Sequence, residues 1–310
     1  MTERERAGAV LREVRKAVVG KETVLAKVLL TILARGHILL EDIPGVGKTT
    51  MALAFSRALS LSHHRVQFTP DVMPSDLTGF SILNKATGEM EYQPGAVLCN
   101  LFLADELNRA TSRTQSALLE AMEEGQVTVD GVSHPVPQPF LVIATQNPTG
   151  ASGTQPLPDS QLDRFMVRLS MGYPAPEEEL ELLRRKQQGN PLLQVAQAAT
   201  LEELEEMRRA ADRVHIGEAV GAYIVSLVST TRRHPLIVQG ASPRATLAVA
   251  AMSRAAAFVQ GRDFVIPEDV QAVFRDTVAH RLILSPRVES EGLAHPLEAV
   301  LQAVRAPEIR

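Results

Sequence analysis

A glycine-rich turn that carries a lysine and two threonines is the first feature of the chain that could do chemistry. The turn reads PGVGKTT over residues 44–50 and follows a short apolar run at 37–41. Such a run predicts a buried strand, and residues 49–59 have the pattern of a helix. Backbone N–H groups between a strand and a helix can surround a phosphate, and the helix dipole adds positive potential there. Lys48 would contact the β and γ phosphates, and the Thr49 hydroxyl would bind Mg²⁺. The predicted binding residues of this turn are Pro44, Gly45, Val46, Gly47, Lys48, Thr49 and Thr50.

One position near this turn departs from the usual phosphate-loop pattern, G-x-x-x-x-G-K-[ST]. Asp42 stands where the pattern has its first glycine. Aspartate adopts left-handed backbone angles more readily than most residues, so we expect the loop to form. The carboxylate would lie near a polyanion, and we expect it to weaken nucleotide binding.

Two carboxylates at the end of a second apolar run are the next chemical feature. Residues 100–105 read NLFLAD, and Glu106 follows them. The carboxyl ends of parallel strands form the ligand-binding edge of open α/β sheets. We expect Asp105 to hold Mg²⁺ through water and Glu106 to polarise the attacking water as general base. Alone, such a run usually marks only the end of a strand. Downstream of a phosphate loop, it predicts hydrolysis.

Three further side chains could complete a site for phosphoryl transfer. Asn147 follows a third apolar run at 140–145, where an uncharged amide could orient the attacking water. Arg164 and Arg244 could neutralise the charge that develops on the transferred group. Arg244 lies in the first turn of a predicted helix, where a cation opposes the helix dipole. Isolated arginines more often form surface ion pairs, and Asp163 is such a neighbour for Arg164.

The elements that position these residues alternate between strands and helices, as in an α/β domain with a buried parallel sheet. Period-two spacing predicts two inserted β-hairpins, at 82–92 and around an Asp-Gly turn at 126–132. After Pro174 the pattern becomes wholly helical. Helix starts are indicated at Pro176, at Thr200 with Glu203, at Pro243 and at Pro267. We therefore predict an α/β core over residues 1–173 and an all-helical domain over residues 174–310.

Composition narrows the classes of function that fit the chain. Its 310 residues are 45% hydrophobic, which indicates a folded protein. A net charge of −4 and an aromatic content of 4% argue against a nucleic-acid-binding surface. The apolar runs fall well short of the roughly twenty residues of a membrane span. The single cysteine, Cys99, excludes an intrachain disulfide, and we expect it in the core of a cytoplasmic protein. The chain contains neither H-E-x-x-H nor G-x-S-x-G, so Mg²⁺ is the only metal that the motifs support.

Together these residues resemble the MoxR family of AAA+ ATPases, and the resemblance covers most of the chain. It rests on Val19-Gly20, GHILLE at 36–41, PGVGKT at 44–49, QFTPD at 67–71, PSDLTG at 74–79, DELNRA at 105–110, TQSALLEAM at 114–122, ATQNP at 144–148, QLDRF at 161–165 and SPR at 242–244. The ordered set is far more specific than any single motif. It implies a P-loop AAA+ core with a parallel sheet and β-hairpin insertions, followed by a helical lid domain.

The resemblance also implies roles for the late residues. Asn147 would be the sensor-1 asparagine, and Arg164 the arginine finger that acts in the neighbouring subunit's site. Arg244 would be the sensor-2 arginine that reports nucleotide to the lid. The two hairpins lie where the family carries its helix-2 and pre-sensor-1 insertions, which usually face the substrate.

The implied ligands are ATP or ADP with Mg²⁺, and Val19 and Gly20 would join the nucleotide site. Gln67, on a further strand, is expected to pair with Glu106. The implied assembly is a homo-oligomeric ring, typically a hexamer, with chaperone-like activity that often acts on partners with a von Willebrand factor A domain. Two alternatives remain open. One is a nucleotide-dependent binding scaffold with little or no hydrolysis, which is suggested by Asp42 in place of the first glycine of the phosphate loop. The other is a related motor that acts on nucleic acid or in metal chelation.

Overall fold

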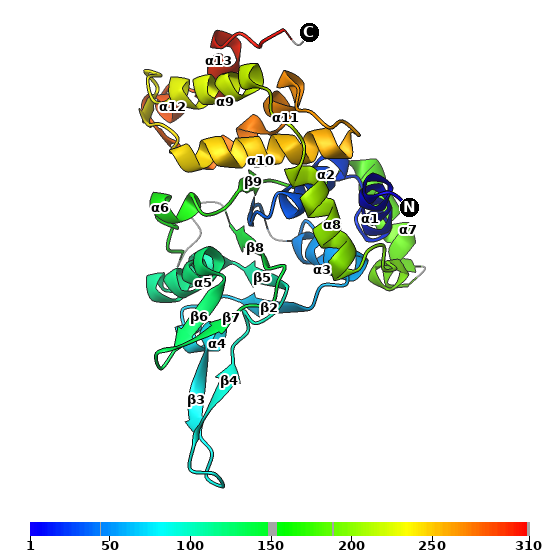
Figure 1. Cartoon of the computed structure of the whole chain (residues 1–310), viewed down its shortest axis with the longest axis vertical. Helices are drawn as coiled ribbons and strands as arrows, with labels where there is room; N and C mark the ends of the chain where they lie inside the picture. The colour runs from blue at the N-terminus through cyan, green and yellow to red at the C-terminus, as the bar shows by residue number, and fades with distance from the viewer. Residues whose placement is uncertain (44, 148–153, 188, 309–310) are drawn as a thin grey trace.

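The structure is a computed structural model that describes residues 1–43, 45–147, 154–187 and 189–308. A twisted sheet with flanking helices lies at its centre, lid helices lie at one end, and a long hairpin projects at the other (Figure 1). Within the described ranges, no helix is long and apolar enough to cross a bilayer.

Five parallel strands form the central sheet in the order β2-β5-β8-β1-β9. Their bounds are His63–Gln67 for β2, Leu101–Asp105 for β5, Leu141–Gln146 for β8, Ile38–Glu41 for β1 and Val167–Leu169 for β9. The three predicted strands are thereby confirmed as β1, β5 and β8. Strands β2 and β9 are not among the strands predicted from apolar runs. The first is a largely exposed edge strand of mostly polar residues, and the second is only three residues long.

Both faces of the sheet are buried. Leu101 and Leu103 of β5 enter one apolar cluster, whereas Phe102 and Ala104 enter another. Successive side chains of a strand point to opposite faces, so this division shows that helices cover the sheet on both sides. Cys99 is 1% exposed and belongs to the second cluster, which confirms that it is a core residue.

The helices predicted at 49–59, Pro176, Thr200, Pro243 and Pro267 begin within one residue of those signals. The helices before residue 163 are α1 (Glu3–Ala17), α2 (Glu22–Leu33), α3 (Lys48–Ala58), α4 (Pro74–Thr78), α5 (Ser112–Glu124) and α6 (Asp159–Leu162). Those after residue 173 are α7 (Pro176–Gln187), α8 (Leu201–Asp212), α9 (Glu218–Thr231), α10 (Pro243–Val259), α11 (Pro267–Val278), α12 (Arg287–Ser290) and α13 (Pro296–Ala303). Short 3₁₀ turns are η1 (Leu107–Arg109), η2 (Pro191–Gln194) and η3 (Ala279–Arg281). Thr200 and Glu203 form the predicted capping box at the start of α8.

Both predicted hairpins are present. The first pairs β3 (Gly79–Leu83) with β4 (Met90–Pro94), and the second pairs β6 (Gln126–Val129) with β7 (Val132–Pro135). Asp130 and Gly131 form the turn of the second, with φ of 51° and 79°, as a two-residue hairpin turn requires. Stacking of Tyr92 on His134, with ring centroids 3.7 Å apart, joins the two hairpins.

The part of the chain after residue 173 is helical, with one addition. A short antiparallel pair, β10 (Ile237–Gln239) with β11 (Ile283–Leu284), interrupts the helices, so the domain is not strictly all-helical. Two and three residues of alternating pattern are too few to distinguish from a loop. Apolar residues of α1 and α2 share one cluster with those of α8 and α10. The core therefore runs across residue 173, and the predicted boundary there stays a prediction.

Candidate nucleotide site

The phosphate loop lies between β1 and α3, as predicted. Gly45 and Gly47 have φ of 87° and 96°, a left-handed conformation that favours glycine. Helix α3 begins at Lys48, so its first backbone N–H groups face the loop. The Nζ atom of Lys48 is buried and donates to the backbone carbonyl of Asp42 at 2.8 Å. Pro44, a predicted member of this set, falls outside the described residues.

The carboxylate of Asp42 is held by the segment that follows β9. It accepts hydrogen bonds from the Ser170 hydroxyl at 3.2 Å, from the Gly172 backbone N–H at 3.2 Å and from the Met171 backbone N–H. Asp42 is only 6% exposed. These donors satisfy the carboxylate from the β9 side of the loop. Its function in this structure is to tie the phosphate loop to the start of the lid segment.

A cavity of about 600 Å³ adjoins the phosphate loop. It is lined by Val19 and Thr50 and by the loop residues Gly45, Val46 and Gly47, with Tyr173, Leu182 and Leu183 on the lid side. The structure thus brings Val19 and Thr50 to the loop, as predicted. Gly20 does not line the cavity, and it lies instead against the side chain of Glu178. The cavity is mostly apolar and lies beside the phosphate-binding backbone, a combination that suits a nucleoside.

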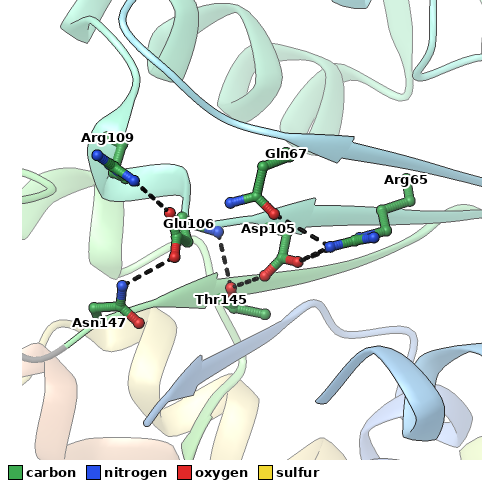
Figure 2. Close-up of polar contacts among 7 residues, drawn as sticks. All are labelled: Arg65, Gln67, Asp105, Glu106, Arg109, Thr145 and Asn147. Atoms are coloured by element: carbon green, nitrogen blue, oxygen red, sulfur yellow. Dashed lines mark hydrogen bonds and ion pairs between the residues drawn. The ribbon is translucent and has the colours of Figure 1, made fainter. Parts of the chain in front are cut away.

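Asp105 and Glu106 lie at the carboxyl end of β5, and one hydroxyl connects them (Figure 2). The Thr145 hydroxyl donates to Oδ1 of Asp105 at 2.7 Å and accepts from the Glu106 backbone N–H at 2.9 Å. The other carboxylate oxygen of Asp105, Oδ2, pairs with the Arg65 guanidinium at 2.7 Å. Glu106 has φ of 56°, in the left-handed region that a glutamate rarely adopts.

Both carboxylate oxygens of Glu106 have partners. Asn147 Nδ2 donates to Oε1 at 3.2 Å, and the Arg109 guanidinium lies 3.1 Å from Oε2 (Figure 2). The predicted neighbourhood of Asn147 and Glu106 is therefore present. The predicted pairing of Gln67 with Glu106 is wrong, because Gln67 accepts instead from Arg65 at 3.2 Å. Arg65 and Gln67 lie two residues apart on β2, so they point to the same face.

The charges of the site interact. Burial is the main cause that lowers the pKa of Lys48, and the carboxylates of Asp42, Asp105 and Glu106 oppose it, in that order. Lys48 of the phosphate loop and the carboxylates at the end of β5 are therefore close enough to interact electrostatically at the same edge of the sheet. The lysine is a desolvated cation set among carboxylates, and an anionic phosphate would relieve its burial cost.

Arg164 and Arg244 lie at the other end of the sheet. Arg164 precedes β9, and Arg244 is the second residue of α10. Both line a cavity with Gly36 and His37, which precede β1, whereas the phosphate loop follows β1. Four residues of β1 span roughly 13 Å, so neither guanidinium shares a site with Lys48 of the same chain. Both arginines instead pair with one carboxylate, that of Glu123 at the end of α5.

Known proteins resemble the chain over nearly its whole length. Residues 37–167 match the model of the ATPase family associated with various cellular activities (AAA), and residues 229–303 match the AAA lid domain. "Chaperone MoxR1" of Mycobacterium tuberculosis is 38% identical over 308 residues, which cover 96% of this chain and 81% of that protein. The chain belongs to the MoxR family of AAA+ ATPases.

Other relatives of this MoxR-family chain agree. "Uncharacterized protein YeaC" of Bacillus subtilis is 42% identical over 302 residues, covering 97% of this chain and 94% of the relative. The crystal structure of a putative ATPase from Cytophaga hutchinsonii superposes with a TM-score of 0.92 at 39% identity, covering 99% of this chain and 96% of that one. The family binds nucleotide, which agrees with the loop and cavity described above.

The residues at the edge of this MoxR-type sheet fit Mg²⁺. The Thr49 hydroxyl at the start of α3 and the Asp105 carboxylate offer hard oxygen ligands, as Mg²⁺ prefers. The described residues contain no cluster of three or more histidine, cysteine or acidic side chains that could cage a metal by themselves. Mg²⁺ usually binds through one or two protein oxygens together with water and substrate phosphates, so this donor set suits it.

Four residues of this MoxR-family chain that pair with predicted site residues were not singled out from the sequence. They are Arg65, Arg109, Thr145 and Glu123. Thr145 lies within the ATQNP motif, so its place at a strand end was the available signal. Arg109 lies three residues after Glu106 and could have been found from that spacing. Arg65 and Glu123 gave no signal, because only the fold brings them to their partners.

Proposed function

We propose that this chain hydrolyses ATP in a Mg²⁺-dependent reaction within an oligomeric ring and couples hydrolysis to remodelling of partner proteins. One observation carries the hydrolytic part. Three segments that follow β1, β5 and β8 bring Lys48, the pair Asp105-Glu106 and Asn147 to a single edge of the sheet. That edge is where open parallel sheets bind ligands.

The residues of this edge divide the work of phosphoryl transfer. Lys48 leaves the carbonyl of Asp42 to donate to phosphate oxygens, and the α3 N-terminus adds positive potential. Thr49 and Asp105 would hold Mg²⁺, which would neutralise charge on the phosphates when bound. Glu106 accepts a proton from the attacking water, and Asn147 orients that water from the adjacent strand.

The position of the two arginines supports the proposal of a ring. Arg164 and Arg244 lie one strand length away from the chain's own phosphate loop. A guanidinium that stabilises transferred phosphoryl charge must touch it, so we place both arginines in the neighbouring subunit's site. We take six subunits from the family resemblance. Specific activity should then rise with protein concentration as rings form, whereas a constant rate from a proven monomer would contradict the arrangement.

The partner is assigned by resemblance. A relative is called a chaperone, and the resemblance to the MoxR family implies a partner that contains a von Willebrand factor A domain. The projecting hairpin carries exposed apolar side chains, among them Phe80, Leu83 and Met90, which is consistent with protein contacts. We propose a cytoplasmic setting. The test is whether a protein with a von Willebrand factor A domain co-purifies with this chain in the presence of ATP. Adding that protein should also change the rate of ATP hydrolysis.

The experiment that tests the hydrolytic function uses Glu106→Gln. We expect it to bind ATP as the parent does and to lose hydrolysis by about a hundredfold or more, because the general base is removed. Arg113→Ala is the matched control, since the side chain of Arg113 is exposed and forms no hydrogen bond or ion pair with the described residues. Phosphate release at the parent's rate from Glu106→Gln would remove Glu106 from the mechanism.

A nucleotide-dependent scaffold is the second candidate, and the partners of Glu106 favour it. Both oxygens of that carboxylate are bonded to Asn147 and Arg109, so the base is occupied in this conformation. A scaffold would bind ATP with no measurable phosphate release from the parent, even with partner present. Parent hydrolysis that disappears in Glu106→Gln excludes it.

A further inference from the structure

The carboxylate of Glu123 bridges two guanidinium groups from distant parts of the chain. Its Oε2 atom lies 2.9 Å from Arg164, and its Oε1 atom lies 2.7 Å from Arg244. Arg164 precedes β9, and Arg244 is the second residue of the lid helix α10. Glu123 therefore joins a core residue and a lid residue through one side chain.

Two guanidinium groups on one carboxylate repel each other, and a third cation lies nearby. Burial lowers the pKa of Arg281, its pairing with Asp163 raises it, and the adjacent Arg244 lowers it again. A carboxylate between like charges is what allows them to stay side by side. Without Glu123, Arg164 and Arg244 would separate toward solvent.

The position of Glu123 is itself fixed by the end of α5. The neighbouring carbonyl of Met122 accepts from the His37 ring at 3.3 Å, and His37 Nδ1 accepts from the Val142 backbone N–H at 3.0 Å. Gly125 ends the helix in a left-handed conformation. The carboxylate thus projects from a helix end that is anchored to the sheet.

The two arginine-bearing segments are also tied to each other. The Ser242 hydroxyl donates to the Asp163 carboxylate at 3.1 Å, and these residues lie next to or near the two arginines in sequence. The guanidinium side chains remain partly open, with 28% of Arg164 and 47% of Arg244 exposed. Partly exposed ion pairs are weak, so a phosphate can replace Glu123 as the partner of the arginines at a small cost in free energy.

We propose that Glu123 is a positioning residue that presents Arg164 and Arg244 together to the terminal phosphate of a nucleotide bound by the next subunit. The inference rests on the proposed function, since it needs the arginines to act between subunits. The new element is that the Glu123 carboxylate holds both arginines in position before they contact the phosphate. A loss of this geometry costs rate, because a small displacement of a stabilising charge can lower turnover by about a hundredfold.

The test measures ATP hydrolysis in mixed assemblies made by co-expression. Glu123→Gln alone should hydrolyse ATP about ten- to a hundredfold more slowly than the parent while it binds nucleotide equally well. Mixed with Glu106→Gln subunits, whose arginines are intact, it should regain hydrolysis. Mixed with Arg164→Ala subunits, Glu123→Gln should not regain hydrolysis, because the arginines that each subunit presents to its neighbour are then defective in every subunit. Glu124→Gln, next along the helix, should match the parent, because the Glu124 side chain is exposed and forms no hydrogen bond or ion pair with the described residues.

Several outcomes would overturn the inference. One is parent-like hydrolysis by Glu123→Gln. Another is that Glu123→Gln is slow and regains no hydrolysis when mixed with Glu106→Gln subunits, although Arg164→Ala does regain it in the same mixture. That result would overturn the role of Glu123 and leave the proposed function intact. If Arg164→Ala is not rescued by Glu106→Gln either, the arrangement between subunits fails and the inference fails with it. Should Glu123→Gln fail to assemble, Glu123→Asp, which keeps the charge, carries the same mixing experiment.

Discussion

The backbone nitrogen of Gly172 lies 3.2 Å from Oδ1 of Asp42. This contact connects the phosphate loop to the first residues after β9, and Tyr173 directly beyond them lines the cavity beside the loop. The carbonyl of Asp42 meanwhile holds the Nζ atom of Lys48. Asp42 thus bonds to Lys48 through its backbone carbonyl and to the segment after β9 through its side chain.

Replacing Asp42 should therefore cost stability more than it changes nucleotide affinity. Asp42→Ala leaves the backbone N–H groups of Met171 and Gly172 without their acceptor, which should lower the free energy of unfolding by about 2 kcal/mol. Asp42→Asn keeps an acceptor and should lose less. Urea unfolding measures both, with exposed Asp71→Ala as control.

The same variants test whether Asp42 repels the phosphates. Because its carboxylate is satisfied by donors from the β9 side, we expect Asp42→Asn to change ATP affinity by no more than about twofold, or 0.4 kcal/mol. Binding that is tenfold tighter in Asp42→Asn would show instead that the negative charge opposes nucleotide, as the sequence had led us to expect.

The sequence predicted the elements whose signals are local. The apolar runs of β1, β5 and β8 are buried on both faces, and the Asp130-Gly131 turn needs the left-handed angles that these residues supply. Lys48, Asp105, Glu106 and Asn147 could be found because each lies at or beyond the carboxyl end of a predicted strand. Strand β9 could not, since three residues carry too little periodicity.

The ion pairs of the site could not be predicted from sequence. Arg65 lies 40 residues from Asp105, and Glu123 lies 121 residues from Arg244. Such pairs depend on how strands and helices pack rather than on any local pattern. For the same reason the sequence could not place Arg244 with Arg164 at the end of the sheet away from the phosphate loop.

Thr145 should matter for turnover more than for nucleotide binding. Thr145→Val removes the hydroxyl that bonds both Asp105 and the backbone of Glu106, so the two carboxylates lose their common anchor. We expect the hydrolysis rate at saturating ATP to fall by about tenfold or more, with little change in ATP affinity. Thr145→Ser keeps the hydroxyl and should stay near the parent. A Thr145→Ser variant as slow as Thr145→Val would contradict this, because it would show that the hydroxyl alone does not maintain the rate.

Arg65 should compete with Mg²⁺ for Asp105. Its guanidinium pairs with Oδ2 of that carboxylate at 2.7 Å, and the arginine side chain is 48% exposed. Exposed pairs contribute up to about 1 kcal/mol, so Arg65→Ala should lower the Mg²⁺ concentration for half-maximal hydrolysis by up to about fivefold. Titration of Mg²⁺ at fixed ATP measures it, with Arg113→Ala as control. An unchanged or raised requirement would mean that Arg65 supports the metal site.

His37 should make the fold sensitive to acid. Its Nδ1 accepts from Val142 and its Nε2 donates to Met122, so the neutral ring fits, and burial lowers its pKa to about 4. The unfolded chain binds a proton near pH 6.5 and the folded chain does not, so stability falls as the pH drops from 6.5 toward 4. The slope from this residue is at most about 1.4 kcal/mol per pH unit. His37→Gln should be less stable than the parent at pH 7.5, and the gap between them should narrow as the pH falls through that window. Urea unfolding at intervals of one pH unit measures the gap, and a constant difference would show that His37 does not titrate between the two states.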